Sequence, residues 1–474
     1  MILIETNKID KRNLIAFIFS LILLILIKVP LLHLPFYWDE AWSYAKAVNE
    51  MYTHTTTLLP SKVNQEVFRG HPLFFYFISS IFAKISGITP LSMHSWMLIC
   101  TCTGLVILYT QLKNLYNSSI ALLSSVFLIV QEVFIVQSTF LLPEIIIALL
   151  TILCFCFYFK NSIWQYILCG TMLVLTKETG LVAILAVLFH SIVLIFIRKD
   201  WNVIAFKKLF WLSMPLLVFA IFIILQKLKW GWFLFPNHVS LMDFSYPSIK
   251  GKLIAFIEFV FYQQSRKFYF ILMLIGISYL YIEKKNVFKK LFLDQRIGLF
   301  VIFIGFYFAF SAVNFYSARY LLSIFPIVAI ISAIVFYEVI ANSNRLFSAT
   351  IATGIFFILN YYFTPFNDFG DTSKYYSKVV ETQSKTFDHF VAKHKSETFG
   401  GDFLINVNLQ NPEMGYLKNT GPIQVLPIQE AKFVIATSID QIEENLKSEI
   451  NDSSLKLVHE EINQPAWCRV YQRK

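Results

Sequence analysis

Two adjacent carboxylates, Asp39 and Glu40, follow directly after the first strongly apolar segment of the chain, residues 14–34. A charged side chain near hydrocarbon is costly unless it has a partner or a function. Apolar residues recur at helical spacing from Trp38 to Tyr52, so we expect a helix on the membrane surface with the carboxylates at its start. A carboxylate held there could act as a general base. The alternative is that the acids only cap the helix and favour its positive end.

Basic side chains recur at breaks between the apolar segments, beside polar or aromatic neighbours. Such cations could bind an anionic ligand, and a lipid phosphate is the natural candidate because its oxygens accept charge-assisted hydrogen bonds. The alternative is non-specific contact with lipid headgroups. The positions concerned are Arg69 with His71, Lys177 with Glu178, and Arg319 with Tyr320.

Two further residues have both a functional and an ordinary interpretation. Glu144 follows Pro143 at the start of an apolar segment, where it is either a site acid or the usual first-turn acid of a helix. His238 lies in an aromatic-rich loop at residues 227–267. It could be a base or a metal ligand, although a lone histidine is more often neither.

Long apolar segments must hold these residues in place. The chain has 474 residues, of which 57% are hydrophobic and only 15% are charged. Repeated apolar runs of roughly 20 residues predict a polytopic α-helical membrane protein with about eleven transmembrane helices. Lys28 lies within the first span and is expected to snorkel to the headgroups. The expected spans are residues 14–35, 91–111, 118–138, 141–159, 162–176, 179–197, 208–226, 268–283, 297–313, 320–340 and 347–363.

The distribution of charge predicts the orientation. The net charge of +10 could indicate a nucleic-acid partner, but the basic residues concentrate in short links on one side of the predicted spans. By the positive-inside rule that side is the cytoplasm, so the lipid bilayer, and not nucleic acid, is the expected partner. The first span has no small-residue cleavage site and is expected to be retained. We therefore expect a protein of the cytoplasmic membrane with a cytoplasmic N-terminus, and with the loops 36–90 and 227–267 and the C-terminus outside.

A change of composition near residue 365 predicts a second domain. The long apolar runs stop there, so we expect an extracytoplasmic α/β domain at residues 365–474 after a transmembrane module at residues 1–364. A helix is expected at 374–395. No Gly-rich phosphate loop, dinucleotide fingerprint or zincin motif occurs, and the cysteines show no metal-binding or disulfide spacing. Strands are expected at residues 403–407, 423–426, 433–437, 455–458 and 467–471.

Taken in order along residues 14–340, these features resemble the integral-membrane glycosyltransferases of the GT-C superfamily. They are similar in particular to the bacterial family 39 proteins (protein-mannosyltransferase-like) and to the aminoarabinose transferases that act on lipid A. Each motif alone is weak, whereas five in the right order and on the same side are more specific. The motifs are Asp39-Glu40, His71-Pro72, Glu144, Lys177 with Gly180, and Arg319-Tyr320-Leu321-Leu322 with Pro326.

The resemblance implies an enzyme that moves a sugar from a polyprenyl-phosphate-linked donor to an acceptor outside the cytoplasm. The acceptor would be a lipid, a glycan or a protein. Asp39 would be the general base, and Glu40 and Glu144 would shape the site or bind a metal or the acceptor. Lys177 and Arg319 would hold the donor phosphate. The remaining substrate-binding candidates are Arg69, His71, Glu178, Tyr320 and His238.

A divalent metal ion stays open, because Gly70 stands where the aminoarabinose transferases carry an acid. Two other classes of protein also stay open. A transporter or flippase of a lipid-linked saccharide would place polar residues deep within several spans and would often contain internal repeats. A non-catalytic assembly protein would tolerate replacement of Asp39.

Overall fold

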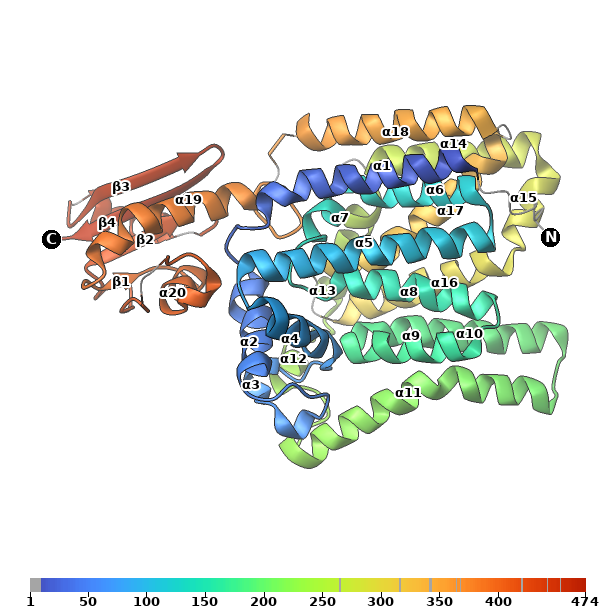
Figure 1. The fold of residues 1–474 in the computed structure, drawn as a ribbon, viewed down its shortest axis with the longest axis horizontal. Helices are drawn as coiled ribbons and strands as arrows, with labels where there is room; N and C mark the ends of the chain where they lie inside the picture. Colours follow the sequence, from blue (N-terminus) through green and yellow to red (C-terminus); the bar gives the residue numbers. More distant parts are fainter. Residues whose placement is uncertain are drawn as a thin grey trace.

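The computed structural model describes residues 10–474 except 264–265, 315–316, 341–342, 364, 367, 419–420, 441 and 452. An elongated bundle of helices forms one part of the molecule, and a small domain with a β-sheet lies at one end of it (Figure 1). We call the end of the bundle beside this sheet the domain end. The fold confirms the expected polytopic membrane protein with a C-terminal α/β domain.

Seven helical segments in the described ranges are long and apolar enough to cross a membrane, counting adjoining 3-10 turns. An eighth span arises if the bent pair α13 (Tyr246–Ile257) and α14 (Arg266–Glu283) counts as one, and four apolar helices are shorter. The seven contain α1 (Lys11–Lys28), α5 (Pro90–Leu115), α10 (Leu181–Arg198), α11 (Val203–Trp230), α16 (Gln295–Val313), α17 (Phe325–Ile340) and α18 (Ser343–Phe363). The shorter ones are α4 (Phe74–Ser86), α6 (Ser118–Ile129), α8 (Glu144–Phe159) and α9 (Ile163–Thr176).

Each range in which the sequence predicts a span contains a helix, but two details differ. The expected continuous helix at 118–138 is broken between α6 and the short α7 (Glu132–Gln137). Lys28 does not snorkel. Its side chain is buried and its Nζ donates to the carbonyl of Val136 at 3.2 Å, because a partner inside the protein is available.

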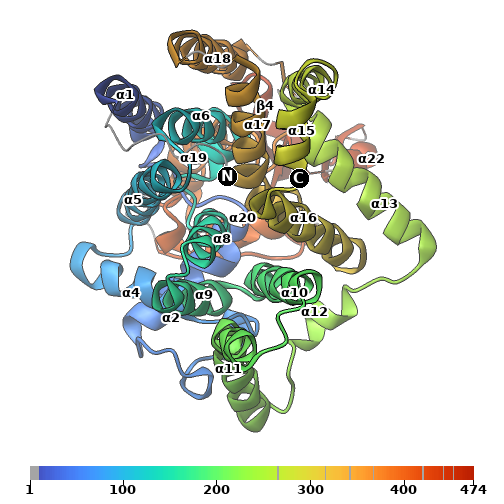
Figure 2. The same cartoon turned by 90° about the vertical axis from the view of Figure 1, so that its right-hand side faces the viewer.

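Helix α8 lies at the centre of the bundle (Figure 2) and packs against α5 and α9. It is apolar on all sides, as expected of a fully buried helix, and nearly all its residues are buried. Pro143 and Glu144 begin it, as the sequence predicts. The central helix therefore places one carboxylate at the domain end.

The C-terminal domain contains a four-stranded sheet in the order β1-β2-β4-β3. The short β1 (Phe399–Gly400) pairs in parallel with β2 (Phe433–Thr437), and β4 (Ala466–Arg473) is antiparallel to both β2 and β3 (Leu455–Asn463). Helix α19 (Tyr376–His389) packs on β3 and β4. The last three predicted strands and the predicted helix are confirmed.

Two predicted strands are wrong. Residues 403–407 begin the helix α20 (Phe403–Gln410), because the Asp402 carboxylate accepts the backbone N–H of Ile405 at 2.7 Å and caps the first turn. Residues 423–426 form no strand and contribute only an isolated bridge between Val425 and Phe399. Short apolar runs do not distinguish these states.

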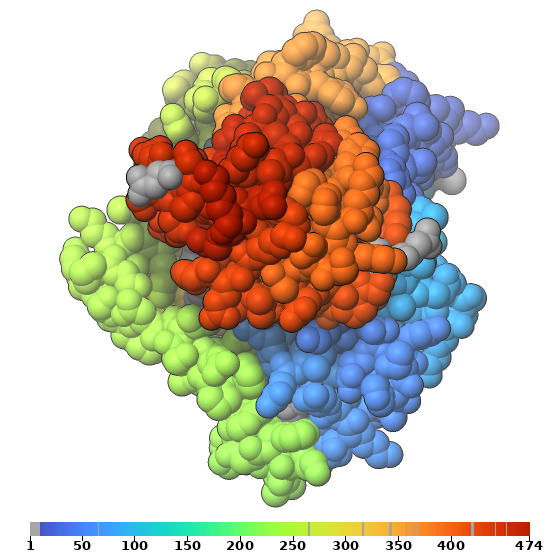
Figure 3. All heavy atoms as spheres, turned by 90° about the vertical axis from the view of Figure 1, so that its left-hand side faces the viewer, coloured from blue at the N-terminus to red at the C-terminus, as the bar shows by residue number. Residues whose placement is uncertain are grey.

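The C-terminal domain lies against the bundle at the domain end. Viewed from that end, it is next to the blue and light-green segments that follow α1 and α11 (Figure 3). The backbone N–H of Phe36 donates to the carbonyl of Met414 at 3.0 Å, and the hydroxyl of Tyr37 donates to the carbonyl of Phe369 at 2.7 Å. The expected surface helix begins here, as a π-helical turn (Glu40–Tyr44) followed by α2 (Ala45–Thr53).

Candidate active site

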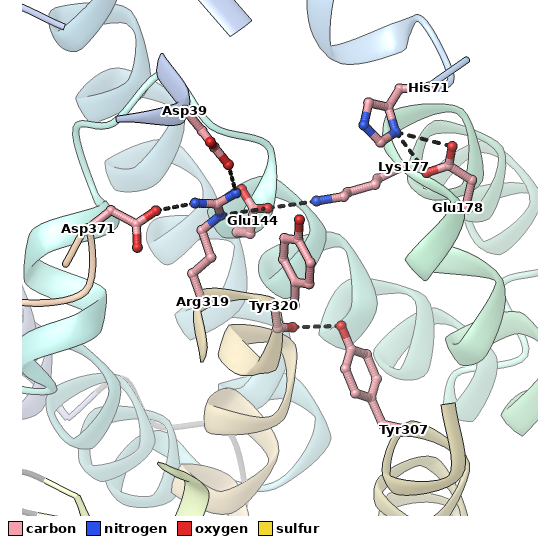
Figure 4. Close-up of polar contacts among 9 residues, drawn as sticks. All are labelled: Asp39, His71, Glu144, Lys177, Glu178, Tyr307, Arg319, Tyr320 and Asp371. Carbon is pink, nitrogen blue, oxygen red and sulfur yellow. Dashed lines mark hydrogen bonds and ion pairs between the residues drawn. The ribbon is translucent and has the colours of Figure 1, made fainter. Parts of the chain in front are cut away.

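A buried arginine, Arg319, is the centre of an ion-pair network at the domain end (Figure 4). It lies in the 3-10 segment Ala318–Ile324 that leads into α17. One terminal nitrogen of its guanidinium donates to Asp39 and the other donates to Asp371, while its Nε lies 3.4 Å from Oε1 of Glu144. Only 3% of the Arg319 side chain is exposed. A charge so deeply buried needs such partners, because its hydration is lost.

The second cation of the network is Lys177, in the extended turn between α9 and the 3-10 turn Glu178–Gly180. Its Nζ donates to Oε1 of Glu144 at 2.8 Å and lies 3.9 Å from the centre of the Tyr320 ring. The ring face attracts the ammonium group. The Tyr320 carbonyl accepts a hydrogen bond from the hydroxyl of Tyr307 at 2.6 Å, which anchors the 3-10 segment Ala318–Ile324. Lys177 therefore lies at the connection between α9 and α10.

Glu144 joins the two cations through one oxygen. Its other carboxylate oxygen, Oε2, is buried and has no hydrogen-bond partner among the described residues. A buried carboxylate oxygen without a partner is costly in the unliganded protein. Oε2 of Glu144 could accept a hydrogen bond from a substrate hydroxyl.

Asp39 is the more accessible acid, since 19% of its side chain is exposed against 3% for Glu144. Its Oδ1 accepts the indole N–H of Trp42 at 2.7 Å. Burial disfavours the charged form of Asp39. The guanidinium of Arg319 and the bond from Trp42 outweigh this and lower the pKa of Asp39 below its ordinary value.

The network carries more negative than positive charge when all its members are ionised. Its carboxylates are Asp39, Glu144 and Asp371, and its cations are Arg319 and Lys177. Two positive and three negative charges leave a net charge of −1. This net charge repels an incoming anion, so departure of a carboxylate would favour its binding.

A second group of predicted residues lies beside the network. Nδ1 of His71 is 3.1 Å from both carboxylate oxygens of Glu178, and the ring of His238 lies 4.8 Å from the ring of His71. Burial, with the charge of His71 as the next cause, lowers the pKa of His238 to about 4. The guanidinium of Arg69 lies 4.4 Å from the centre of the Trp42 ring. This group is thus linked to Asp39 through Trp42.

Gly70 permits this arrangement. Its φ is +72°, a conformation that side chains disfavour, and a Cβ there would lie 2.9 Å from the Trp232 ring. The backbone between Arg69 and His71 can therefore approach the aromatic loop after α11, which also carries His238.

Glu40 does not join the network, although it is adjacent to Asp39. Its fully buried carboxylate accepts the backbone N–H groups of Tyr37 at 3.1 Å and Leu141 at 2.5 Å, and it lies 3.1 Å from Nε2 of His94. These contacts connect the loop after α1 to α5 and to the segment before α8. These contacts therefore give Glu40 a part in the packing of this loop.

Asp371 is the network residue that sequence reasoning missed. It follows the last apolar segment, just as Asp39 follows the first. An acid beyond a span was the signal that singled out Asp39, but after the last span this signal falls first on Asp368 and only then on Asp371. Its neighbours resemble an ordinary polar linker, so nothing else marks it.

Within the described ranges, no group of three or more His, Cys, Asp and Glu side chains is arranged to hold a metal ion. We assign no step of the reaction to a metal. The divalent ion considered from the sequence stays a prediction.

Comparison with known proteins supports one family. Residues 70–233 match the family described as dolichyl-phosphate-mannose-protein mannosyltransferase, a range that contains His71, Glu144, Lys177 and Glu178. No curated protein sequence matches the chain.

Three solved structures are similar to the chain at low sequence identity, and the two of ArnT share its fold. ArnT from Cupriavidus metallidurans bound to undecaprenyl phosphate has a TM-score of 0.61 and 12% identity, over 96% of this chain and 97% of that chain. The structure of ArnT from the same organism in the apo state has a TM-score of 0.60 and 11% identity, over 96% of this chain and 97% of that chain. The oligosaccharyltransferase AglB from Archaeoglobus fulgidus, in complex with an inhibitory peptide and a dolichol-phosphate, has a TM-score of 0.47 and 11% identity, over 96% of this chain and 74% of that chain. The chain is thus similar to this mannosyltransferase family over residues 70–233 and shares the fold of ArnT, which supports the resemblance to the GT-C superfamily of integral-membrane glycosyltransferases.

Proposed function

We propose that this protein is a glycosyltransferase that moves a sugar from a polyprenyl-phosphate-linked donor to a hydroxyl group of an acceptor. The observation that carries the proposal is the convergence of Asp39, Glu144, Lys177 and Arg319 into one network. These residues are distant in sequence and meet at one end of a membrane bundle. ArnT, which shares this fold, was solved with undecaprenyl phosphate, a lipid phosphate of the kind that leaves in this reaction.

Arg319 and Lys177 are the donor-phosphate ligands in this proposal. The guanidinium can bind two phosphate oxygens at once through its two terminal nitrogens, and the ammonium of Lys177 adds a second positive charge. Both stabilise the charge that develops on the phosphate as it leaves. Tyr320 holds the ammonium in place through its ring.

Asp39 is the proposed general base. The acceptor hydroxyl loses its proton to the Asp39 carboxylate as its oxygen forms a bond to the anomeric carbon of the sugar. The bond from that carbon to the phosphate oxygen breaks, and polyprenyl phosphate leaves with the electron pair. Attack opposite the leaving group inverts the anomeric centre, as the family resemblance implies. Asp39 suits this role because it is the more exposed carboxylate.

The other residues bind or orient substrates. Glu144 orients both cations through one oxygen and presents its free Oε2 to a hydroxyl. Arg69, His71, Glu178 and His238 form the wall next to Trp42, on which we place part of the donor or acceptor. The side of the membrane proposed for the site is the extracytoplasmic one, from the positive-inside rule. The acceptor class is a lipid, a glycan or a protein hydroxyl.

The rival function is transport of a lipid-linked saccharide. A transporter needs polar groups at the midplane of the membrane. The charged network described above instead gathers at the domain end of the bundle, which supports transfer.

The test is sugar transfer by purified protein in lipid. Labelled polyprenyl-phosphate sugars serve as donors, and a native envelope extract supplies acceptors. Asp39→Asn should lower the transfer rate by about 10²–10⁴-fold, the usual contribution of a general base, while donor binding persists. The matched control is Asp243→Asn, which makes the same change at an exposed loop residue and should leave the rate unchanged. Equal transfer by Asp39→Asn and wild type would remove Asp39 from the chemistry. Movement of donor across the bilayer without transfer would favour the transporter.

A further inference from the structure

Asp371 lies in the linker between the last membrane helix, α18, and the first helix of the C-terminal domain, α19. Only 11% of its side chain is exposed, and its carboxylate accepts a hydrogen bond from a terminal nitrogen of Arg319. Its backbone carbonyl accepts the side-chain N–H of Gln137 at 2.6 Å. The linker thus inserts a carboxylate into the site from outside the membrane bundle.

The position of Asp371 depends on how the linker and the C-terminal domain rest on the bundle. Two contacts flank it: the carbonyl of Phe369 accepts the Tyr37 hydroxyl at 2.7 Å, and the backbone N–H of Lys374 donates to Glu132 at 3.0 Å. The hydroxyl of Tyr376, the first residue of α19, lies 3.4 Å from the buried Nζ of Lys28. Any shift of this linker would move the Asp371 carboxylate away from Arg319.

The contact occupies the edge of Arg319 that a phosphate would need. Two-point binding of an oxyanion uses N–H groups on neighbouring guanidinium nitrogens. One terminal nitrogen already donates to Asp371 and the other donates to Asp39. Each terminal nitrogen has a second N–H, but a phosphate bound through this edge would lie next to both carboxylates, whose charges repel it. Departure of one carboxylate therefore favours phosphate binding.

We propose that the Asp371 carboxylate holds the place of a donor-phosphate oxygen on Arg319, and that donor binding releases Asp371 together with the linker of the C-terminal domain. This inference rests on the proposed function. The C-terminal domain is then coupled to occupancy of the donor site, and release of polyprenyl phosphate lets the linker return.

Asp371 is the carboxylate better suited to leave. Asp39 is also held by the indole of Trp42 and is the proposed base, whereas the hydrogen bond shown for the Asp371 carboxylate is the one from Arg319. The site shifts the pKa values of the two acids in opposite directions, that of Asp39 down and that of Asp371 up. Burial, with the charges of Asp39 and Glu144, raises the pKa of Asp371 despite the opposing effect of Arg319. Departure of Asp371 also balances the remaining charges, two positive against two negative.

The experiment measures the affinity of purified protein in nanodiscs for a short-chain isoprenyl phosphate. Asp371→Asn should bind it about tenfold or more tightly than wild type, the size expected for removal of one charge at close range with an effective dielectric constant near 20. The matched control is Asp368→Asn, which makes the same change in the same linker at an exposed residue and should bind as wild type does. Thermal unfolding checks that each variant is folded.

The outcomes separate this inference from the function it rests on. Binding by wild type with equal or weaker binding by Asp371→Asn would overturn the inference and leave the donor assignment intact. No binding by any of the proteins would overturn the donor assignment itself.

Hydrogen exchange supplies a second readout. Isoprenyl phosphate should increase exchange in residues 368–376 of wild type, whereas Asp371→Asn should show increased exchange there before the ligand is added. Unchanged exchange in this segment on binding would also overturn the inference.

Discussion

Replacement of Arg319 by glutamine tests whether the network is coupled as the structure shows. Arg319 contacts three carboxylates, of which Asp39 and Asp371 contact no other cation in the described chain. Removal of one partner of a buried ion pair costs about 3–5 kcal/mol, because the other charge stays buried without compensation. We therefore expect Arg319→Gln to lower the free energy of unfolding by about 3–5 kcal/mol.

A double-mutant cycle isolates the interaction with Asp371. Asp371→Asn removes one of the charges that Arg319→Gln leaves uncompensated, so the double variant should be more stable than the sum of the single effects predicts. We expect a coupling energy of about 0.5–3 kcal/mol, the range measured for residues in one network. The assay is unfolding in mixed micelles of sodium dodecyl sulfate and a mild detergent, followed by tryptophan fluorescence and circular dichroism.

The matched control is the exposed ion pair between Lys432 and Glu397 in the C-terminal domain, whose atoms are 2.7 Å apart. Exposed pairs contribute about 0–1 kcal/mol, so the cycle of Lys432→Gln and Glu397→Gln should show less coupling than the Arg319 cycle. Additive effects of Arg319→Gln and Asp371→Asn, within about 0.5 kcal/mol, would refute the arrangement of the network and with it the argument for donor competition.

Three further predictions concern the site. The acid limb of the pH profile of kcat/KM should lie at lower pH than an ordinary aspartate would give, because Arg319 lowers the pKa of Asp39 in the free enzyme and the base is lost only when Asp39 is protonated. The acid limb of kcat should lie at higher pH than that of kcat/KM, because the donor phosphate then shares Arg319. Coincident limbs would contradict this. Lys177→Gln should raise the KM for the donor by about tenfold or more through loss of one charge near the phosphate, whereas Lys229→Gln, an exposed residue at the end of α11, should not change it. Glu40→Ala should lower the free energy of unfolding by about 1–3 kcal/mol because two buried backbone N–H groups lose their acceptor. The transfer rate of the folded protein should stay within about twofold of wild type. If folded Glu40→Ala protein lost as much transfer as Asp39→Asn, Glu40 would have a role in catalysis.

Hydropathy and charge are local properties, and the sequence by itself determined what depends on them. The membrane helices lie where the apolar runs predict them, and the acids and cations at their ends, such as Glu144 and Lys177, begin helices or occupy turns as expected. The polar composition after the last span predicted the C-terminal α/β domain. Its short apolar runs were less informative, and residues 403–407 are helical because Asp402 caps them.

Only the tertiary structure decided which side chains meet. Asp39 and Glu40 are neighbours of the same type, yet successive residues of a helical turn point in directions about 100° apart. One therefore contacts Arg319 while the other is bonded to backbone N–H groups and lies beside His94. Asp371 reaches Arg319 only because the linker to the C-terminal domain folds back onto the bundle. Pairings across such distances depend on how the helices pack, and no local pattern of residues specifies that packing.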